Sequence, residues 1–102
     1  MRSKFHTGIV VSLAFLLFGC SPALYLPTSA DAGHAGTSVD SLLIGREMYV
    51  KSCGSCHSLR QPERYSRSIW LQAMPKMQVK AKISVSDAKL ITSFVLARCK
   101  PE

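Results

Sequence analysis

The sequence predicts an all-α fold of three or more helices, and two observations lead to this class. Beyond about residue 39, three segments repeat their apolar residues every three or four positions, which is the spacing of one helix face. No segment alternates apolar and polar residues over a length typical of a strand. A chain of 102 residues has room for one small domain at most.

Residues 1–19 are predicted to be an export signal. Arg2 and Lys4 precede an apolar run from Ile9 to Phe18, which is the order of charge and hydrophobicity in bacterial signal peptides. The run is shorter than the roughly 20 apolar residues that span a bilayer. We therefore expect cleavage, and an uncleaved anchor is the alternative.

A cysteine follows directly after this run. The segment Leu17-Phe18-Gly19-Cys20 resembles the lipobox of bacterial lipoproteins, which implies that Cys20 is acylated and becomes the first residue of the mature protein. Cleavage after Ala30 is the alternative, although Ala30 lies far beyond the apolar run. Ser21 stands where some bacteria use aspartate for inner-membrane retention, which favours the outer membrane.

Residues 20–38 are predicted to be a flexible tether, and residues 39–102 to be the folded domain. The tether is rich in Ser, Ala, Gly and Pro and has no sustained apolar period. It would hold the domain off the membrane.

The first predicted helix runs from about Asp40 to Ser52. A serine or aspartate at positions 38 to 41 can accept hydrogen bonds from its free amides. One face carries residues at steps of three or four: Leu42, Gly45, Tyr49 and Cys53. Because glycine costs a helix about 1 kcal/mol relative to alanine, Gly45 indicates the close approach of another backbone.

The second predicted helix begins near Ser66 and carries Trp70 and Met74. Pro75 should end it, because proline has no amide hydrogen to donate and disfavours helical geometry in the residue before it. Met77 is then expected in a loop.

The third predicted helix follows Ser84, with Asp87 three positions later as in a capping box. Pro101 stops it. Its apolar face consists of Leu90, Ile91, Phe94 and Val95. We expect this face to meet the first helix at Gly45.

The residues that carry chemistry are Cys53-Gly54-Ser55-Cys56-His57, at the end of the first helix. Two thiols three positions apart can form thioether bonds to both vinyl groups of one haem, and the adjacent imidazole is then held under the iron. Cys53 and Cys56 are therefore predicted to attach a haem, and His57 to bind its iron. Because a domain of about 60 residues is marginally stable alone, we expect the haem-free chain to be largely unfolded.

Other uses of these cysteines fit the sequence less well. A thioredoxin-like redox pair would need a βαβ surround. A structural zinc site would need two more ligands, for which His34 and Cys99 are the candidates outside the signal. A disulfide between Cys53 and Cys56 would leave the domain little to fold around. For Cys99, three roles stay open: a buried small residue, a free thiol or a link to another chain.

Beyond this motif, the chain resembles the small monohaem class I cytochromes c over about Leu42 to Ala97. The resemblance includes Gly45 and Tyr49 before the haem motif, Trp70 after it, and Phe94 in the last helix. It implies a cytochrome c-like domain of three or more helices around one covalent haem c. It also implies that the first and last helices cross at the glycine and that a methionine is the second axial ligand.

The methionine expected to bind iron is Met77, and Met74 is the alternative. Met77 follows Pro75 in a segment that can bend its thioether towards the iron, and its spacing from Trp70 resembles that of the family. Trp70 and Tyr49 are expected to lie near the haem, where Trp70 could donate to a propionate. Ordinary core packing is the equal alternative for both aromatic residues.

The chain departs from the family between His57 and Trp70. This stretch is compact and lacks a glycine-proline loop, so Pro62 is the candidate for the carbonyl that orients His57. Three basic residues could pair with propionates, face a partner or remain solvated: Arg60, Arg64 and Lys76.

The charge balance is consistent with a protein partner. Of the 13 basic residues, Arg2 and Lys4 leave with the signal, so 11 remain against 6 acidic residues, a surplus of five. A basic face can steer acidic docking faces of proteins or lie near anionic lipids. Nucleic acid is not an expected partner of an exported chain.

These features predict an electron carrier or electron-transfer subunit, and not an enzyme, on the periplasmic side of a Gram-negative cell membrane. It would exchange single electrons with redox proteins of the periplasm or membrane and be held by lipid on Cys20. The alternative is a haem-based sensor or small-molecule binder with an open sixth iron site. A peroxidase would need distal acid-base groups, and the predicted domain has no distal histidine.

Overall fold

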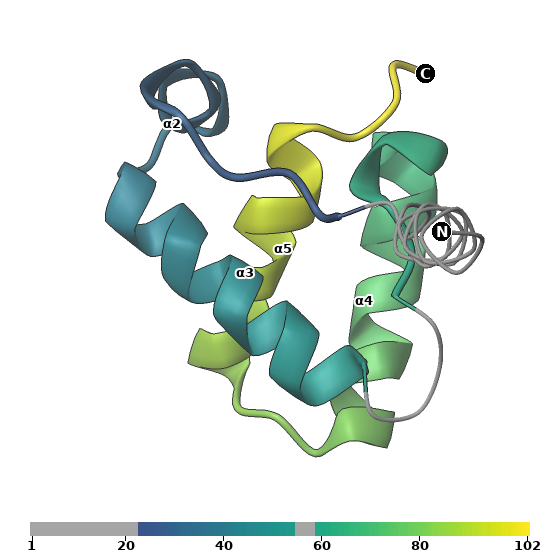
Figure 1. The fold of residues 1–102 in the computed structure, drawn as a ribbon. Helices are drawn as coiled ribbons and strands as arrows, with labels where there is room; N and C mark the ends of the chain where they lie inside the picture. Colours follow the sequence, from purple (N-terminus) through teal and green to yellow (C-terminus); the bar gives the residue numbers. More distant parts are fainter. Residues whose placement is uncertain (1–22, 55–58) are drawn as a thin grey trace, which may run out of the picture.

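The computed structural model describes residues 23–54 and 59–102, which form four α-helices and one short 3-10 helix (Figure 1). In chain order they are α2 (Ser29–Ala35), α3 (Val39–Cys53), η1 (Pro62–Arg64), α4 (Arg67–Ala81) and α5 (Val85–Ala97). These residues contain no strand, and an isolated bridge pairs Ser66 with Lys100. The predicted all-α class is confirmed. The predicted signal over residues 1–19 lies outside the described residues.

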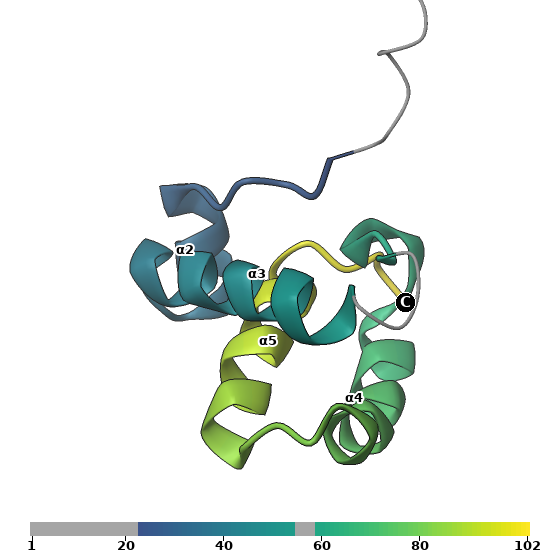
Figure 2. The same ribbon diagram turned by 60° about the horizontal axis from the view of Figure 1, so that its bottom comes forward.

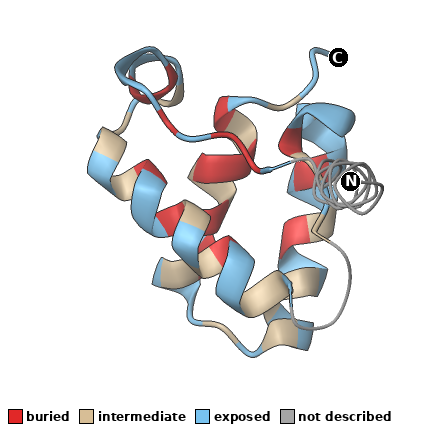
Figure 3. Cartoon of the chain, in the orientation of Figure 1, coloured by how far each residue is buried: buried red, intermediate tan, exposed pale blue. Residues whose placement is uncertain are grey.

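The contact between α3 and α5 is the centre of the fold. A Cβ atom added to Gly45 of α3 would lie 2.2 Å from the carbonyl oxygen of Leu90 and 3.1 Å from the Cβ of Phe94. Only glycine lets the two backbones come this close, so the predicted crossing at Gly45 is confirmed. Figure 3 shows buried residues on the facing sides of the two helices. The fully buried side chains of the core include Leu42, Ile91, Phe94 and Val95.

The three long helices begin where the sequence predicts, each after a serine N-cap: Ser38, Ser66 and Ser84. The Ser84 hydroxyl accepts a hydrogen bond from the Asp87 amide at 3.1 Å. At the other end of α4, Lys82 adopts the left-handed conformation with φ of 55°. Its amide donates to the carbonyls of Gln78 and Val79 and thereby satisfies the end of the helix.

α4 differs from the prediction, because Pro75 lies inside it and does not end it. Met77, expected in a loop, is therefore helical. Pro75 deprives the Leu71 carbonyl of its amide donor, but Leu71 and Pro75 are both exposed, so water can hydrate that carbonyl. The adjacent face of α4 buries Trp70 and Met74, and this packing outweighs the helix propensity of one residue.

The segment predicted as a flexible tether is the second correction. Its described part lies against the core, and Figure 1 shows it passing over α5 before it enters α2. Leu24 and Tyr25 are buried, and the Tyr25 ring stacks on Phe94 with 4.6 Å between ring centroids. Thr28 and Asp31 form a capping box that starts α2. Two apolar residues and one short helix are too little to produce a recognisable period in the sequence.

Within the described residues, no helix is both long enough and apolar enough to cross a bilayer.

Candidate functional site

A cavity of about 230 Å³ lies between the end of α3, residues 59–65 and the inner face of α4. α4 packs mainly on α5 (Figure 1). The cavity lies between α4 and the last turn of α3. The lining is largely apolar and consists of Tyr49, Cys53, Leu59, Arg60, Tyr65, Ile69, Trp70, Ala73, Met74 and Met77. Among the described residues, Arg60 is the one charged side chain in this lining.

Two aromatic residues of the lining hold residues 60–62, of which Arg60 lines the cavity. The Tyr49 hydroxyl donates to the Arg60 carbonyl at 2.6 Å, and Trp70 Nε1 donates to the Pro62 carbonyl at 3.0 Å. Their rings meet edge to face, with centroids 6.4 Å apart. Burial raises the pKa of Tyr49 to about 12, and the nearby Cys53 thiol adds to this shift. Tyr49 is therefore a neutral hydrogen-bond donor at physiological pH.

The Trp70 hydrogen bond bears on two predictions. Its indole N–H, one possible donor to a haem propionate in the sequence analysis, donates to the backbone carbonyl of Pro62. The Pro62 carbonyl, expected to orient His57, receives this hydrogen bond. Trp70 thus has a structural role in placing the segment that follows the predicted haem motif.

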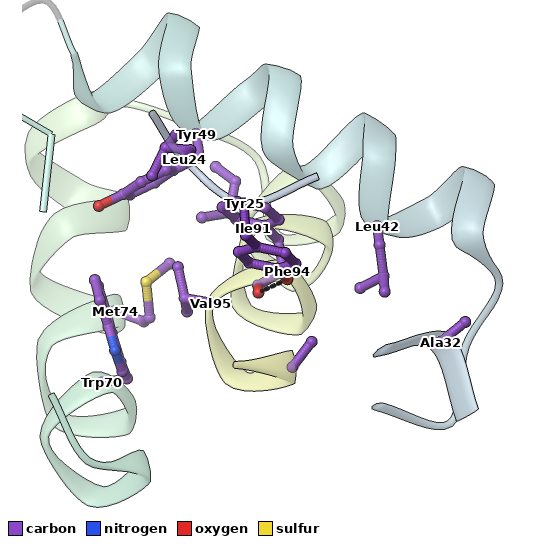
Figure 4. Close-up of a cluster of buried hydrophobic side chains, with 11 residues drawn as sticks. Leu24, Tyr25, Ala32, Leu42, Tyr49, Trp70, Met74, Ile91, Phe94 and Val95 are labelled. Carbon is purple, nitrogen blue, oxygen red and sulfur yellow. Dashed lines mark hydrogen bonds between the residues drawn. The ribbon is translucent and has the colours of Figure 1, made fainter. Parts of the chain in front are cut away.

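Sulfur atoms reach the cavity from two helices. Cys53 is the last residue of α3 and is half-buried. Met74 and Met77 line the cavity from α4. Met74 is 7% exposed and belongs to the core cluster, whereas Met77 is half-buried and lies outside that cluster. Figure 4 shows Met74 and Trp70 projecting from α4 on the side that faces Tyr49.

Three predicted site residues lie outside the described residues: Cys20, Cys56 and His57. The chain leaves the described part after Gly54 and re-enters it at Leu59. Cys53 and Leu59 both line the cavity, so the segment that carries Cys56 and His57 is joined to the cavity wall at both of its ends.

The three basic candidates differ in their position relative to the cavity, since Arg60 lines it and Arg64 and Lys76 do not. The Arg60 guanidinium lies 5.6 Å from the centre of the Tyr65 ring and donates to its hydroxyl. Arg64 and Lys76 are exposed and do not line the cavity. Cys99 has a free, half-buried thiol packed against the core.

Sequence reasoning missed four lining residues: Leu59, Tyr65, Ile69 and Ala73. Ile69, Ala73 and Met77 follow one another at intervals of four, which is the spacing of one helix face. That signal was available, but a helix ended at Pro75 does not extend to Met77.

Among residues 23–54 and 59–102, no three or more His, Cys, Asp or Glu side chains gather into a group that could hold a metal ion. Comparisons with protein-family models, with curated proteins and with solved structures found no match to this chain.

Proposed function

We propose that this protein is a monohaem c-type electron carrier, with haem bonded to Cys53 and Cys56 and its iron bound by His57. The observation that carries the proposal is that Cys53, the first residue of the Cys53-Gly54-Ser55-Cys56-His57 motif, lines an apolar cavity, as does Leu59, two residues beyond the motif. A cysteine pair used only as a disulfide or redox pair does not need an apolar cavity beside it.

The chemistry of the lining fits a haem. The macrocycle is a flat apolar body, and aromatic, aliphatic and thioether side chains from α3 and α4 supply apolar walls for it. Its propionates are anionic, and the Arg60 guanidinium is the cation in the lining. A bound haem would supply one-electron chemistry between ferrous and ferric iron. The residues of the chain would exclude water and hold the iron ligands.

Met77 is the proposed sixth ligand, and Met74 is the alternative. Met74 packs in the buried core, so turning its thioether towards a haem would remove apolar contacts from that core. Met77 is half-buried and lines the cavity without belonging to the core cluster. Ligation by histidine and methionine raises the reduction potential of a haem relative to two histidines.

A second candidate is a haem sensor or small-molecule binder with an open sixth site. The observation that favours it is the helical position of both methionines, because a helix restricts the movement of a side chain towards the iron more than a loop does. Carbon monoxide distinguishes the two candidates. Rapid binding to the ferrous protein would support the open site, and failure to bind would support the electron carrier.

We further propose that the carrier works on the periplasmic side of a Gram-negative membrane, held by acyl chains on Cys20. Its partners would then be redox proteins of the periplasm or membrane, and the basic surplus favours partners with acidic docking faces.

The test is to express the full chain in a Gram-negative host that matures c-type cytochromes and to examine the membrane fraction. A reduced pyridine haem spectrum and a peptide mass with both Cys53 and Cys56 bonded to one haem are expected. Colourless protein with both thiols unmodified would overturn the proposal.

The Met77→Ala variant should lose the near-red ligand-to-metal band of the ferric protein, because this band reports a thioether on the iron. Met74→Ala tests the alternative ligand. Met48→Ala is the matched control, because Met48 packs against the core and does not line the cavity. Loss of the band in Met74→Ala alone would assign the iron ligand to Met74.

A further inference from the structure

The docked N-terminal segment begins very close to the proposed lipid attachment point. Only Ser21, Pro22 and Ala23 separate Cys20 from Leu24, and Leu24 is 8% exposed. The distance that the chain can cover between the acylated residue and the folded domain therefore depends on how firmly Leu24 and Tyr25 are held.

The first set of contacts fixes the backbone carbonyls of Leu24 and Tyr25 and the ring of Tyr25. The Arg46 side chain of α3 donates from Nε to the Tyr25 carbonyl at 3.0 Å and from its second amino group to the Leu24 carbonyl at 3.4 Å. The Tyr25 ring stacks on Phe94 with an interplanar angle of 3°, and its hydroxyl donates to the Phe94 carbonyl (Figure 4). Burial raises the pKa of this hydroxyl, so it stays protonated and able to donate.

The second set of contacts fixes Asp31, six residues after Tyr25. Arg98, which follows α5, donates from Nε to Asp31 Oδ1 at 2.8 Å and from its second amino group to Asp31 Oδ2 at 3.2 Å. The same guanidinium lies 4.6 Å from the centre of the Tyr25 ring. One arginine therefore fixes α2 and the residues before it to the end of α5.

We propose that the acylated protein is seated directly on the bilayer by this docked segment, with the Leu26 side facing the lipid headgroups. The proposal rests on the acylation of Cys20 proposed above. A free tether from residue 20 to residue 38 would have a mean span of roughly 25 Å and a full reach of roughly 60 Å. With Leu24 docked, the reach from Cys20 to the folded domain is at most about 14 Å.

The two ends of the molecule then differ in their distance from lipid. Leu26 is 65% exposed and, six residues from Cys20, lies within about 21 Å of it whatever the path of the chain. Val79 is 78% exposed near the end of α4, and Figures 1 and 2 show that this end lies across the molecule from the docked segment.

Seating also brings the cavity close to the membrane. The Phe94 ring lies between Tyr25 and Tyr49, at 4.6 Å from the first and 5.7 Å from the second. Since Tyr49 lines the cavity, one ring separates the docked segment from the cavity wall. A partner would have to present its own redox centre near the bilayer surface.

The test places a benzophenone photo-crosslinker on the acylated protein in vesicles of phosphatidylethanolamine and phosphatidylglycerol. The crosslinker is attached through Leu26→Cys or, as the matched exposed position, through Val79→Cys, both in a Cys99→Ser background. After irradiation, mass spectrometry measures the lipid adduct at each position. Lipid adducts are expected at position 26. The adduct yield at position 79 should be only a small fraction of the yield at position 26.

A variant with 15 Gly and Ser residues inserted after Pro22 keeps the docking contacts and lengthens the chain between Cys20 and Leu24. It should lose the adduct at position 26 without losing vesicle binding. Equal adduct yields at both positions, or a yield at position 26 that the insertion leaves unchanged, would overturn the seating.

The failure of the proposed function is observed separately. Cys20 without acyl mass would overturn the anchor and the seating with it. An acylated chain that folds without haem would overturn the redox function, while the adduct yields, measured with Cys53→Ser and Cys56→Ser added to the background, would still decide the seating.

Discussion

At Gly45, the absence of a side chain sets the distance between α3 and α5. The atom that a Cβ would meet first is a backbone oxygen, that of Leu90, at 2.2 Å. A flexible side chain could rotate away from such a contact, but a carbonyl within a helix cannot. Any larger residue must therefore push α5 away from α3 and loosen the packing of Phe94 between them.

We expect Gly45→Ala to destabilise the haem-loaded protein by about 3 kcal/mol or more, because overpacking against backbone cannot be relieved by rotamer changes. Urea unfolding followed by far-UV circular dichroism measures the effect. Gly33→Ala is the control, since no atom lies within 4 Å of the added Cβ and alanine favours a helix interior by up to about 1 kcal/mol. Equal effects of the two substitutions would contradict a tight crossing at Gly45.

The Asp31 carboxylate gives the docked segment a dependence on pH. The Arg98 hydrogen bond is the main cause that lowers the pKa of Asp31 from 3.8 to about 2. A carboxyl whose pKa is lower in the folded state contributes stability above its unfolded pKa and loses that contribution as the pH falls through the folded value. We expect a loss of about 1 kcal/mol between pH 4 and pH 2, because the Arg98 side chain is 41% exposed and solvent screens the pair.

Urea titrations across this range measure the loss, and Asp31→Asn should remove it while leaving the titration of the other carboxyl groups in place. The same slope in the wild type and in Asp31→Asn would show that the ion pair does not contribute.

At the scale of the element, α4 is the helix whose start was predicted correctly and whose end was not. Its starting cap at Ser66 is a local signal, and the helix begins there as predicted. Its end is not local, because the helix continues through Pro75 to Ala81. The buried side chains of Trp70 and Met74 tie one face to the core, and the proline lies on the exposed face, where the freed carbonyl can be hydrated.

We expect Pro75→Ala to stabilise the protein by about 2 kcal/mol. The substitution restores the amide that bonds to the Leu71 carbonyl, which raises the free energy of unfolding by about 3 kcal/mol. The greater flexibility of the unfolded chain lowers it by up to about 1 kcal/mol. Thermal and urea unfolding measure the change. Pro101→Ala is the matched control, since Pro101 is exposed beyond the last helix. A loss of stability in Pro75→Ala would mean that the proline shapes α4 for a contact that alanine disturbs.

For the whole molecule, the cavity leaves a gap between α4 and the end of α3 beside a single core. α3 and α5 pack directly on one another, whereas α4 faces the end of α3 across the cavity. A small domain has little apolar surface to bury, and an empty cavity reduces it further. A haem in this position would complete the core between the helices.

The haem-free protein, made as the Cys53→Ser, Cys56→Ser double variant, should therefore be largely unfolded. Far-UV circular dichroism is expected to show little helix and no cooperative thermal transition, whereas the haem-loaded protein should show both. A cooperative helical fold without haem would contradict this prediction and would show that packing of α3 on α5 is sufficient.

The sequence by itself determined the features that depend on neighbours a few positions away. Serine caps and apolar residues at helical spacing predicted the starts of α3, α4 and α5, and Gly45 predicted the crossing. Five consecutive residues, beginning with Cys53 at the end of α3, define the proposed haem motif. Each is a short-range signal, because a helix face or a cap involves residues within one or two turns.

Only the tertiary structure decided the course of α4 beyond Pro75, the docking of residues 24 to 36, and the cavity that gathers Tyr49, Trp70 and the two methionines of α4. Leu24 and Tyr25 carry no period of their own, and their burial depends on Phe94, about 70 residues away. Contacts between distant parts of the chain leave no local pattern, since their free energy comes from surfaces that exist only after the helices have packed.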